Sequence, residues 1–242
     1  MKLSHFFIQL PLVGIATVSL AQTPAPYANA SGGRYLREGT EWVTTWLPGA
    51  NTTDQRHVLL VGDSITKGYG SEVPKRLQGT ATCGHFTTSA CAPDPAFALQ
   101  LQSVLAGYHF DVIHFNNGLH GFGYTEEEYK AGYEQALKII RRMQPKVRLI
   151  LALTTPLRAD SEKAELNPRV DARNVIVREL ARQFDTEIDD LHAISEGHAE
   201  YYADPYHYKA EAINLQAAQV AEKVSALLPH SAGSPAAGLP AK

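Results

Sequence analysis

The chain has 242 residues, 44% of them hydrophobic, which is enough apolar material to bury the core of one medium-sized domain. Lys and Arg number 22 against 25 Asp and Glu, so the formal net charge is −3 at pH 7. This balance leaves no excess of basic side chains to neutralise phosphates or to hold an anionic membrane surface, and nucleic acid is therefore not an expected partner.

The N-terminus has the pattern of a secretory signal peptide. Lys2 precedes an apolar stretch from Phe6 to Leu20, and small residues flank a cleavage point after Ala21. An uncleaved anchor is the alternative, but the stretch is shorter than the about 20 apolar residues that span a bilayer. We expect residues 1–21 to be removed and the mature protein to be secreted or periplasmic, with no stable membrane insertion.

Two segments of low complexity flank the expected domain. Residues 22–55 are interpreted as a partly disordered N-terminal extension, because the first part of this segment is rich in Pro, Ala, Gly, Ser and Asn. Within it, Trp42 and Trp46 are expected to cover a sheet edge. Residues 230–242 have the same character and are expected to form a disordered tail, which leaves residues 56–229 as one folded domain.

Apolar periodicity predicts strands and helices that alternate along this domain. The expected strands cover His57 to Val61, Asp111 to Phe115, Val147 to Leu153 and Thr186 to Asp189. The expected helices cover Pro95 to Leu105, Thr125 to Met143, Pro168 to Phe184 and Lys209 to Leu228. Alternation of this kind indicates an α/β fold with parallel strands, whose ligands bind at the carboxyl edge of the sheet.

The chain contains only two cysteines, Cys83 and Cys91. Export permits a disulfide between them, which would close a short loop. Two buried free thiols are an equally good interpretation.

Three residues at opposite ends of the domain have the chemistry of a nucleophilic triad. Ser64 follows the first expected strand at a turn into a helix, where its hydroxyl is exposed and backbone amides can face a developing oxyanion. A serine hydroxyl needs a base and a group that orients the base. Asp204 and His207, on a tight turn before the last helix, suit those roles: the carboxylate accepts from Nδ1 and leaves Nε2 free to take the serine proton.

Each of the three residues also has a purely structural interpretation. Ser64 and Asp204 can be helix caps, and His207 can be an ordinary surface histidine. None of these explanations accounts for the Asp-x-x-His pairing.

The motif Gly62-Asp63-Ser64-Ile65-Thr66, together with Asp204-Pro205-Tyr206-His207, resembles the SGNH, or GDSL, hydrolase superfamily. The resemblance extends over roughly Arg56 to Leu228. It implies a three-layer α/β/α, flavodoxin-like fold with a central parallel sheet, and hydrolysis of carboxylic esters without a cofactor.

The resemblance also implies an oxyanion hole formed by the Ser64 backbone, a glycine amide after the second strand, and an asparagine side chain. For the glycine, Gly84 in a turn-prone stretch is the candidate, with an ordinary loop glycine as the alternative. For the asparagine, Gly118-Leu119-His120-Gly121 aligns with the Gly-x-Asn-Asp of the family, so His120 stands where Asn is expected.

An imidazole N–H can donate to an oxyanion as an amide can, so His120 is the preferred donor. This arrangement resembles a branch of the superfamily with Asn-x-Gly-Leu-His. The competing interpretation assigns the donor to Asn117 or Asn116.

Three further residues are candidates for substrate contacts: Asp63 beside the nucleophile, Thr155 after a strand, and Tyr206 beside the expected base. A simple turn at Pro156 and packing of the tyrosines within their own loop are the alternative explanations. The histidines show no two-ligand spacing on one helix, so no metal site is expected.

The expected activity is hydrolysis of carboxylic esters, small-molecule or glycan, and export favours O-acetylated polysaccharides as substrates. Two alternatives stay open. One is acyl transfer to a sugar hydroxyl on the same fold, and the other is a non-catalytic carbohydrate-binding homologue.

Overall fold

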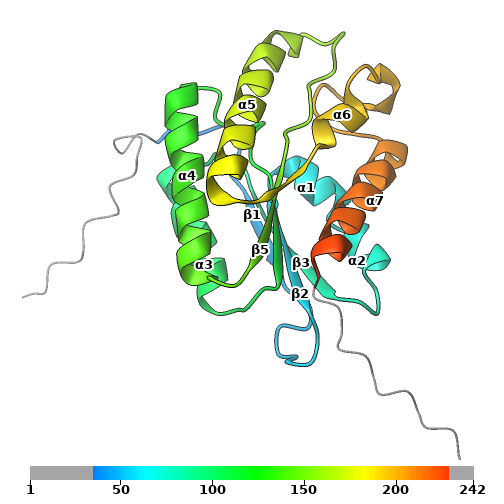
Figure 1. Cartoon of the computed structure of the whole chain (residues 1–242). Helices are drawn as coiled ribbons and strands as arrows, with labels where there is room; N and C mark the ends of the chain where they lie inside the picture. The colour runs from blue at the N-terminus through cyan, green and yellow to red at the C-terminus, as the bar shows by residue number, and fades with distance from the viewer. Residues whose placement is uncertain (1–34, 229–242) are drawn as a thin grey trace, which may run out of the picture.

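A computed structural model describes residues 35–228 (Figure 1). The expected signal peptide and the C-terminal tail lie outside the described residues, as does the first part of the N-terminal extension. Six strands form one sheet in the order β1-β3-β2-β4-β5-β6, in which β1 is antiparallel to β3 and all other pairs are parallel. The strands are β1 (Val43–Trp46), β2 (His57–Gly62), β3 (Thr82–Thr88), β4 (Val112–Phe115), β5 (Arg148–Ala152) and β6 (Glu187–Asp189).

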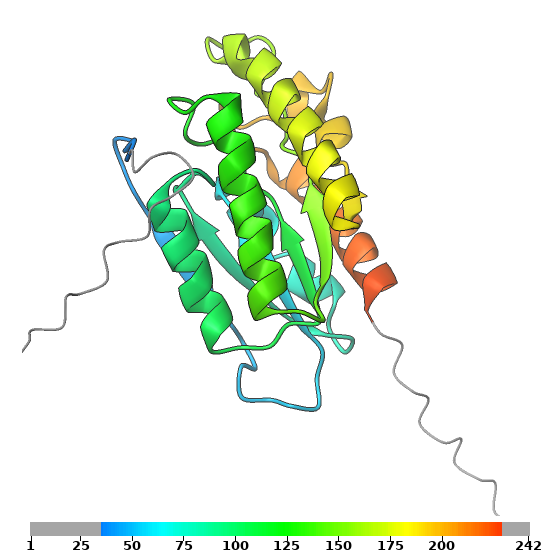
Figure 2. The same ribbon diagram turned by 60° about the vertical axis from the view of Figure 1, so that its left-hand side comes forward.

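Helices connect the strands and cover both faces of the sheet (Figures 1 and 2). They are α1 (Ser64–Tyr69), α2 (Val73–Arg76), α3 (Pro95–Ala106), α4 (Glu126–Met143), α5 (Asn167–Phe184), α6 (Leu191–Ser195) and α7 (Ala210–Leu227), with short 3-10 turns at Ala164–Leu166 and Ala199–Tyr201. This is the three-layer α/β arrangement that the alternating pattern predicts, and the fold prediction is confirmed.

The central strand β2 is apolar on both sides because both of its faces are covered. In β2, Leu59 and Val61 point into the core under α3, α4 and α5. The alternate residues Val58 and Leu60 point into the second core, under α1, α2 and α7. The continuous apolar run that predicted this strand therefore reflects a strand buried between two helical layers.

The connections change direction at β2. The chain leaves β2 for β3 on one side and then crosses to β4 on the other side, so the loops after β2 and β4 diverge above the carboxyl edge. In flavodoxin-like sheets, such a switch point is where ligands bind. Ser64 begins α1 directly after β2 and therefore lies at this point.

The structure corrects the prediction around residue 84. Thr82 to His85 were expected to form a turn, but they belong to β3, which pairs in parallel with β2. A side chain at Gly84 would meet the Trp46 carbonyl oxygen at 2.6 Å. The glycine is therefore present because the segment from β1 crosses closely over the strand, and not because the chain turns.

The extension expected before residue 56 also contributes to the sheet. β1 lies within it and adds an antiparallel edge strand to β3, so the folded unit begins before residue 56. Trp46 is part of that edge strand and is 65% exposed.

The predicted helices are confirmed, with boundaries that differ by one or two residues. The start of α4 could be predicted from the sequence because its capping residues form two hydrogen bonds. The Thr125 hydroxyl accepts from the Glu128 amide at 3.2 Å, and the Glu128 carboxylate accepts from the Thr125 amide at 2.8 Å. This capping box satisfies two first-turn donors. Among residues 35–228, no helix is long and apolar enough to cross a membrane.

Both cysteines are free and buried, which decides between the two interpretations left open by their spacing. Burial raises the pKa of each thiol to about 12. Cys83 lies in β3, whereas Cys91 lies in the loop after it. The thiols are therefore neutral packing groups.

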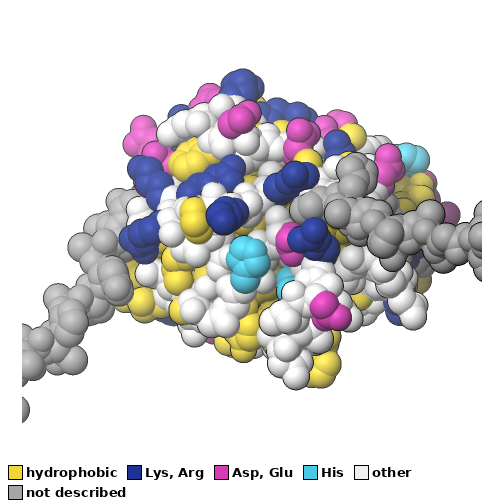
Figure 3. Space-filling view, turned by 60° about the horizontal axis from the view of Figure 1, so that its bottom comes forward, with side chains coloured by type: hydrophobic (Ala, Val, Ile, Leu, Met, Phe, Trp, Pro, Cys, Tyr) yellow, Lys and Arg dark blue, Asp and Glu magenta, His cyan; other side chains and the backbone are white. Residues whose placement is uncertain are grey.

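The amino edge of the sheet lies opposite Ser64 and is viewed in Figure 3, where Lys and Arg side chains are interspersed with acidic and uncharged ones. Several helices end toward this edge, and the last turns of α4 and α5 carry Arg141, Arg142 and Arg182. Cations at helix C-termini offset the negative end of the macrodipole, which explains their positions.

Candidate active site

Three side chains from the two ends of the domain form a hydrogen-bonded chain at the carboxyl edge. The Ser64 Oγ lies 2.9 Å from Nε2 of His207, and Nδ1 of the same ring lies 2.8 Å from Oδ2 of Asp204. Ser64 and His207 are 143 residues apart in the sequence. The fold thus brings together the three residues expected to form a triad.

Local structure presents Ser64 at the first position of α1. The Asp63 carboxylate caps this helix by accepting from the Ile65 amide at 2.9 Å. Gly62 precedes the cap, and any Cβ there would lie 2.0 Å from the Thr66 hydroxyl oxygen. The first amides of a helix have no intrahelical partner, so the Ser64 N–H is available at the site.

The turn that carries Asp204 and His207 is fixed by its own hydrogen bonds. Oδ1 of Asp204 accepts from the amides of Tyr206 and His207, both at 2.8 Å, which leaves Oδ2 for the imidazole. Burial tends to raise the pKa of Asp204, but these hydrogen bonds outweigh it and hold the pKa below its ordinary value. The ionised carboxylate can only accept, so Nδ1 of His207 carries the hydrogen.

The loop after β4, which carries His120, contacts the loop that carries Ser64. The Asp63 carboxylate, which caps α1, also accepts from the Leu119 amide at 3.4 Å. Ser64 and His120 each follow directly after one of these two linked residues. The loop that was expected to donate to an oxyanion therefore lies against the loop that carries the serine.

Two arginines of α5 donate hydrogen bonds to backbone carbonyl oxygens of this loop. Arg173 is fully buried and donates to the carbonyl oxygens of Gly118 and His120, both at 2.7 Å, and to that of Gly121 at 3.0 Å. Its guanidinium stacks 4.4 Å from the centre of the Phe122 ring. Arg169 donates to the Tyr124 carbonyl oxygen at 2.6 Å.

These arginines were missed by reasoning from the sequence. A cation on the buried face of α5, between Val170 and Val177, was a usable indication, because an arginine is almost never buried without partners. Carbonyl oxygens of a distant loop are the partners, and the sequence does not identify them.

The structure excludes the two asparagines as oxyanion donors. The Asn117 side chain is buried and is used by the loop after β3, where Nδ2 donates to the Ala90 carbonyl and Oδ1 accepts from the Ala92 amide. Asn116 donates to the Ala152 carbonyl at 3.1 Å. The Asn117 side chain binds the loop after β3 and the Asn116 side chain binds the end of β5, so His120 remains the candidate donor.

The expectation for Gly84 is wrong. Its partner in the sheet is Leu59, in the middle of β2, well before the end of the strand that precedes Ser64. Because a strand rises about 3.3 Å per residue, the Gly84 amide is too far from Ser64 to contact a shared oxyanion.

The three residues expected to contact the substrate differ in whether their side chains are accessible. Asp63 is 0% exposed and is engaged as a cap and loop tie, so it does not face a substrate. Thr155 is 1% exposed, so it does not face a substrate either. Tyr206 is half-buried, with its ring centre 6.3 Å from that of His207, so of the three it is the one that a substrate can reach.

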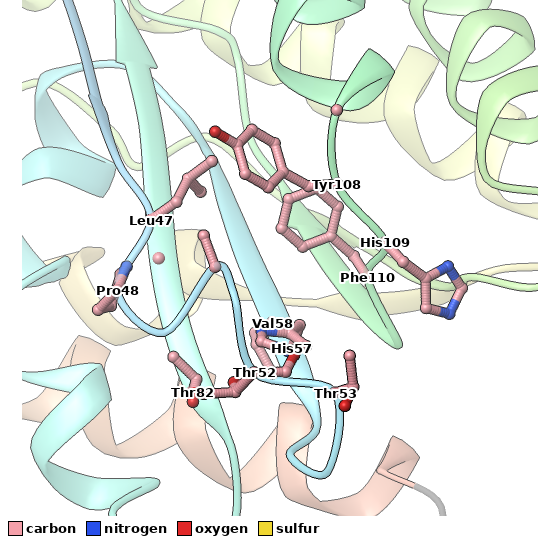
Figure 4. A pocket seen from close by; sticks show the side chains of 13 residues that line it. Leu47, Pro48, Thr52, Thr53, His57, Val58, Thr82, Tyr108, His109 and Phe110 are labelled. Carbon is pink, nitrogen blue, oxygen red and sulfur yellow. Dashed lines mark hydrogen bonds between the residues drawn. The ribbon is translucent and has the colours of Figure 1, made fainter.

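A cavity of about 190 Å³ lies far from the triad, at the amino edge of the sheet (Figure 4). In Figure 4 the Leu47 side chain points toward the rings of Tyr108 and Phe110. A second cavity, of about 260 Å³, includes Pro156 and Tyr202 in its lining and therefore lies beside the loop of Asp204. Among the described residues, no group of three His, Cys, Asp or Glu side chains is placed to hold a metal ion.

No family model matches the sequence, and no curated protein matches it. Solved structures do match. A GDSL-like lipase from Bacteroides thetaiotaomicron is 14% identical, with a TM-score of 0.59 over 72% of this chain and 89% of that one. A carbohydrate acetylesterase from Sinorhizobium meliloti is 16% identical, with a TM-score of 0.59 over 72% of this chain and 100% of that one.

A carbohydrate esterase family 3 protein from Talaromyces cellulolyticus is 18% identical, with a TM-score of 0.56 over 71% of this chain and 97% of that one. At such identities the likeness concerns the fold, which several proteins named as GDSL-like lipases or acylhydrolases share. The chain has the fold of the SGNH, or GDSL, hydrolases.

Proposed function

We propose that the protein is a serine-dependent carboxylic ester hydrolase. The main support for this proposal is the chain of hydrogen bonds that links Ser64 Oγ to His207 Nε2 at 2.9 Å and His207 Nδ1 to Asp204 at 2.8 Å. Ser64 attacks the ester carbonyl while His207 takes its proton and then passes that proton to the leaving alcohol. Water, deprotonated by His207, releases the acid from the acyl-enzyme.

The charge states fit this order of events. The pKa of Asp204 lies below its ordinary value because hydrogen bonds outweigh the opposing effect of burial, so the carboxylate is ionised near neutral pH. It fixes the hydrogen on Nδ1 and leaves a lone pair on Nε2, facing Ser64. The negative charge that develops on the carbonyl oxygen is stabilised by the Ser64 amide and by His120.

We propose O-acetylated carbohydrates as the substrate class. Two proteins of similar fold are named as a carbohydrate acetylesterase and a carbohydrate esterase. The side chains of His207 and Asp204 are each 47% exposed, so an ester on a bulky polymer can approach them without entering a tunnel. Tyr206 provides an aromatic face at the rim, a surface suited to sugar rings.

The test is hydrolysis of p-nitrophenyl acetate and of acetylated xylan by the wild type and by Ser64→Ala, with a serine-directed fluorophosphonate as a covalent label. We expect the wild type to be labelled at Ser64 and the variant to lose labelling and turnover. Labelling elsewhere, or unchanged turnover by Ser64→Ala, overturns the mechanism. Activity on p-nitrophenyl acetate but not on the glycan overturns the substrate class alone.

Export to the periplasm or the medium is part of the proposal, on the basis of residues 1–21. Expression of the full chain in a Gram-negative host, followed by N-terminal sequencing, should find a mature protein that begins at Gln22 outside the cytoplasm. An unprocessed cytoplasmic product contradicts export.

A further inference from the structure

The carboxylate of Glu38 contacts the loop of His120 at two points. Oε2 lies 2.9 Å from Nδ1 of His120, and Oε1 accepts from the Gly121 amide at 3.3 Å. Glu38 precedes β1 and is 82 residues from His120 in the sequence. Through these two contacts, one carboxylate holds both the imidazole ring of His120 and the backbone next to it.

The segment of Glu38 is itself anchored to the domain. Arg37 forms an ion pair with the buried carboxylate of Asp94 at 2.7 Å, and the Trp42 amide donates to the Ser89 hydroxyl at 2.9 Å. The ring of Trp42 meets the ring of His120 edge to face, with centres 6.2 Å apart. Glu38 is therefore held in place on both sides along the chain.

The contact with Glu38 determines which nitrogen of His120 carries a hydrogen. Burial raises the pKa of Glu38, but its contacts with His120 and Gly121 outweigh this and lower the pKa, so the carboxylate is ionised and can only accept. The hydrogen of a neutral ring must then sit on Nδ1, which leaves a lone pair on Nε2. Only the imidazolium form has an Nε2–H to donate, and Nε2 has no hydrogen-bond partner among residues 35–228.

The surrounding charges favour that form. Burial disfavours a charge on His120, but the hydrogen bond to Glu38 and the negative charges of Asp63, Glu38 and Glu41 outweigh it and raise the pKa of the ring above its ordinary value. Two cations also lie nearby: Lys67 of α1 sits over the Trp42 ring at 5.0 Å, and Arg173 of α5 binds the His120 carbonyl. The two cations therefore offset part of the negative charge around His120, but the three carboxylates outnumber them.

We propose that Glu38 holds His120 as an imidazolium whose Nε2–H binds the oxyanion formed when Ser64 attacks the ester. The inference rests on the proposed function and deepens it. His120 would be a catalytic residue, because it touches the reacting oxygen, whereas Glu38 is a positioning residue. The segment before β1 thereby completes the oxyanion hole.

The two histidines of the site then need opposite protonation states. His207 must be neutral to accept the serine proton, whereas His120 must be protonated to donate. The rate therefore falls on the basic side as His120 loses its proton, and it falls in acid because a protonated general base cannot accept the serine proton. The basic limb should lie above about pH 6.5, the ordinary pKa of histidine.

Steady-state kcat and KM, measured from about pH 5 to about pH 9.5 with an acetyl ester, test this. We expect a bell-shaped profile of kcat for the wild type. In Glu38→Gln the amide can donate to Nδ1, so a neutral ring presents Nε2–H; kcat should fall about tenfold near pH 7, KM should change little, and the basic limb should disappear. His120→Asn supplies a donor that does not titrate and should also abolish the basic limb.

Glu200→Gln is the matched control. Glu200 pairs with Nδ1 of His198 at 2.8 Å, a contact of the same chemistry on the exposed surface. Its removal should leave the whole profile unchanged. A wild type without a basic limb, or a Glu38→Gln variant with the wild-type basic limb, overturns the proposal.

A second measurement does not depend on catalysis. In protein labelled with nitrogen-15 at histidine, the His120 ring, assigned by its absence in His120→Asn, should titrate above the ordinary histidine range, and at lower pH in Glu38→Gln. A neutral His120 at pH 7 overturns the inference even if Ser64 is the nucleophile. If instead Ser64→Ala keeps full turnover, the proposed function fails whatever the titration shows.

Discussion

Two histidine–carboxylate pairs flank Ser64, and they differ in origin and surroundings. Asp204 and His207 lie on one turn, three residues apart, with both side chains 47% exposed. Glu38 and His120 come from distant segments, and the His120 side chain is only 14% exposed. In both pairs the carboxylate holds a hydrogen on Nδ1, yet one ring is suited to accept a proton at Nε2 and the other to donate one.

The difference shows that a single local contact does not define the role of a histidine. His207 faces a hydroxyl that it must deprotonate, whereas His120 sits among several carboxylates that favour its charged form.

The largest effect is expected for His207→Ala. Loss of the general base should lower turnover by a factor of about 10⁴ or more, while leaving the fold intact, because the side chain is half exposed. Single-turnover kinetics with p-nitrophenyl acetate and circular dichroism provide the measurement. Turnover within tenfold of the wild type would remove His207 from the mechanism.

His120→Ala should have a smaller effect, a fall of about 10² to 10³ in kcat, because it removes one oxyanion donor and leaves the nucleophile and base in place. Asn117→Ala is the comparison. It should mainly lower the melting temperature, because its amide ties the loop after β4 to the loop that contains Ala90 and Ala92. A fully active His120→Ala protein would return the search for the donor to the backbone.

Arg173→Lys should weaken the loop that carries His120 without touching the pair of Asp204 and His207. A lysine can reach one of the three carbonyl oxygens and leaves two without a partner. Each of these costs about 1 to 3 kcal/mol, so we expect a loss of about 2 to 6 kcal/mol in the free energy of unfolding. Urea titration measures this loss. The kcat of the folded fraction should fall, and labelling of Ser64 by a fluorophosphonate should persist.

The smallest effect concerns Asp204 and stability. Its pKa is lowered in the folded state, so its contribution is present above the ordinary Asp value of about 3.9 and is lost as the pH falls through the lower folded value. Because the carboxylate is half exposed, the contribution should be below about 1 kcal/mol. The melting temperatures of wild type and Asp204→Asn should differ slightly at pH 7 and converge in acid, once Asp204 is protonated in the folded state. A gap that widens in acid would contradict the sign.

The layered fold could be predicted from the sequence, because a strand buried on both faces and a capped helix each produce a recognisable local pattern of residues. The apolar run of β2 and the capping box at Thr125 are readable within a few residues. The prediction failed at Gly84, where a glycine that suggested a turn is required by the close approach of Trp46 from another strand. A local pattern cannot show what crosses over it.

The same limit applies to the site. The nucleophile motif and the Asp-x-x-His turn could be found from the sequence, because each is a short segment whose geometry depends on its own backbone. The three-dimensional structure was needed to show that these segments meet, that the Asn117 side chain binds the loop after β3, and that Glu38 and Arg173 contact the loop of His120. Those contacts join residues far apart along the chain, and their energies depend on burial and on neighbouring charges that exist only once the sheet and its loops have assembled.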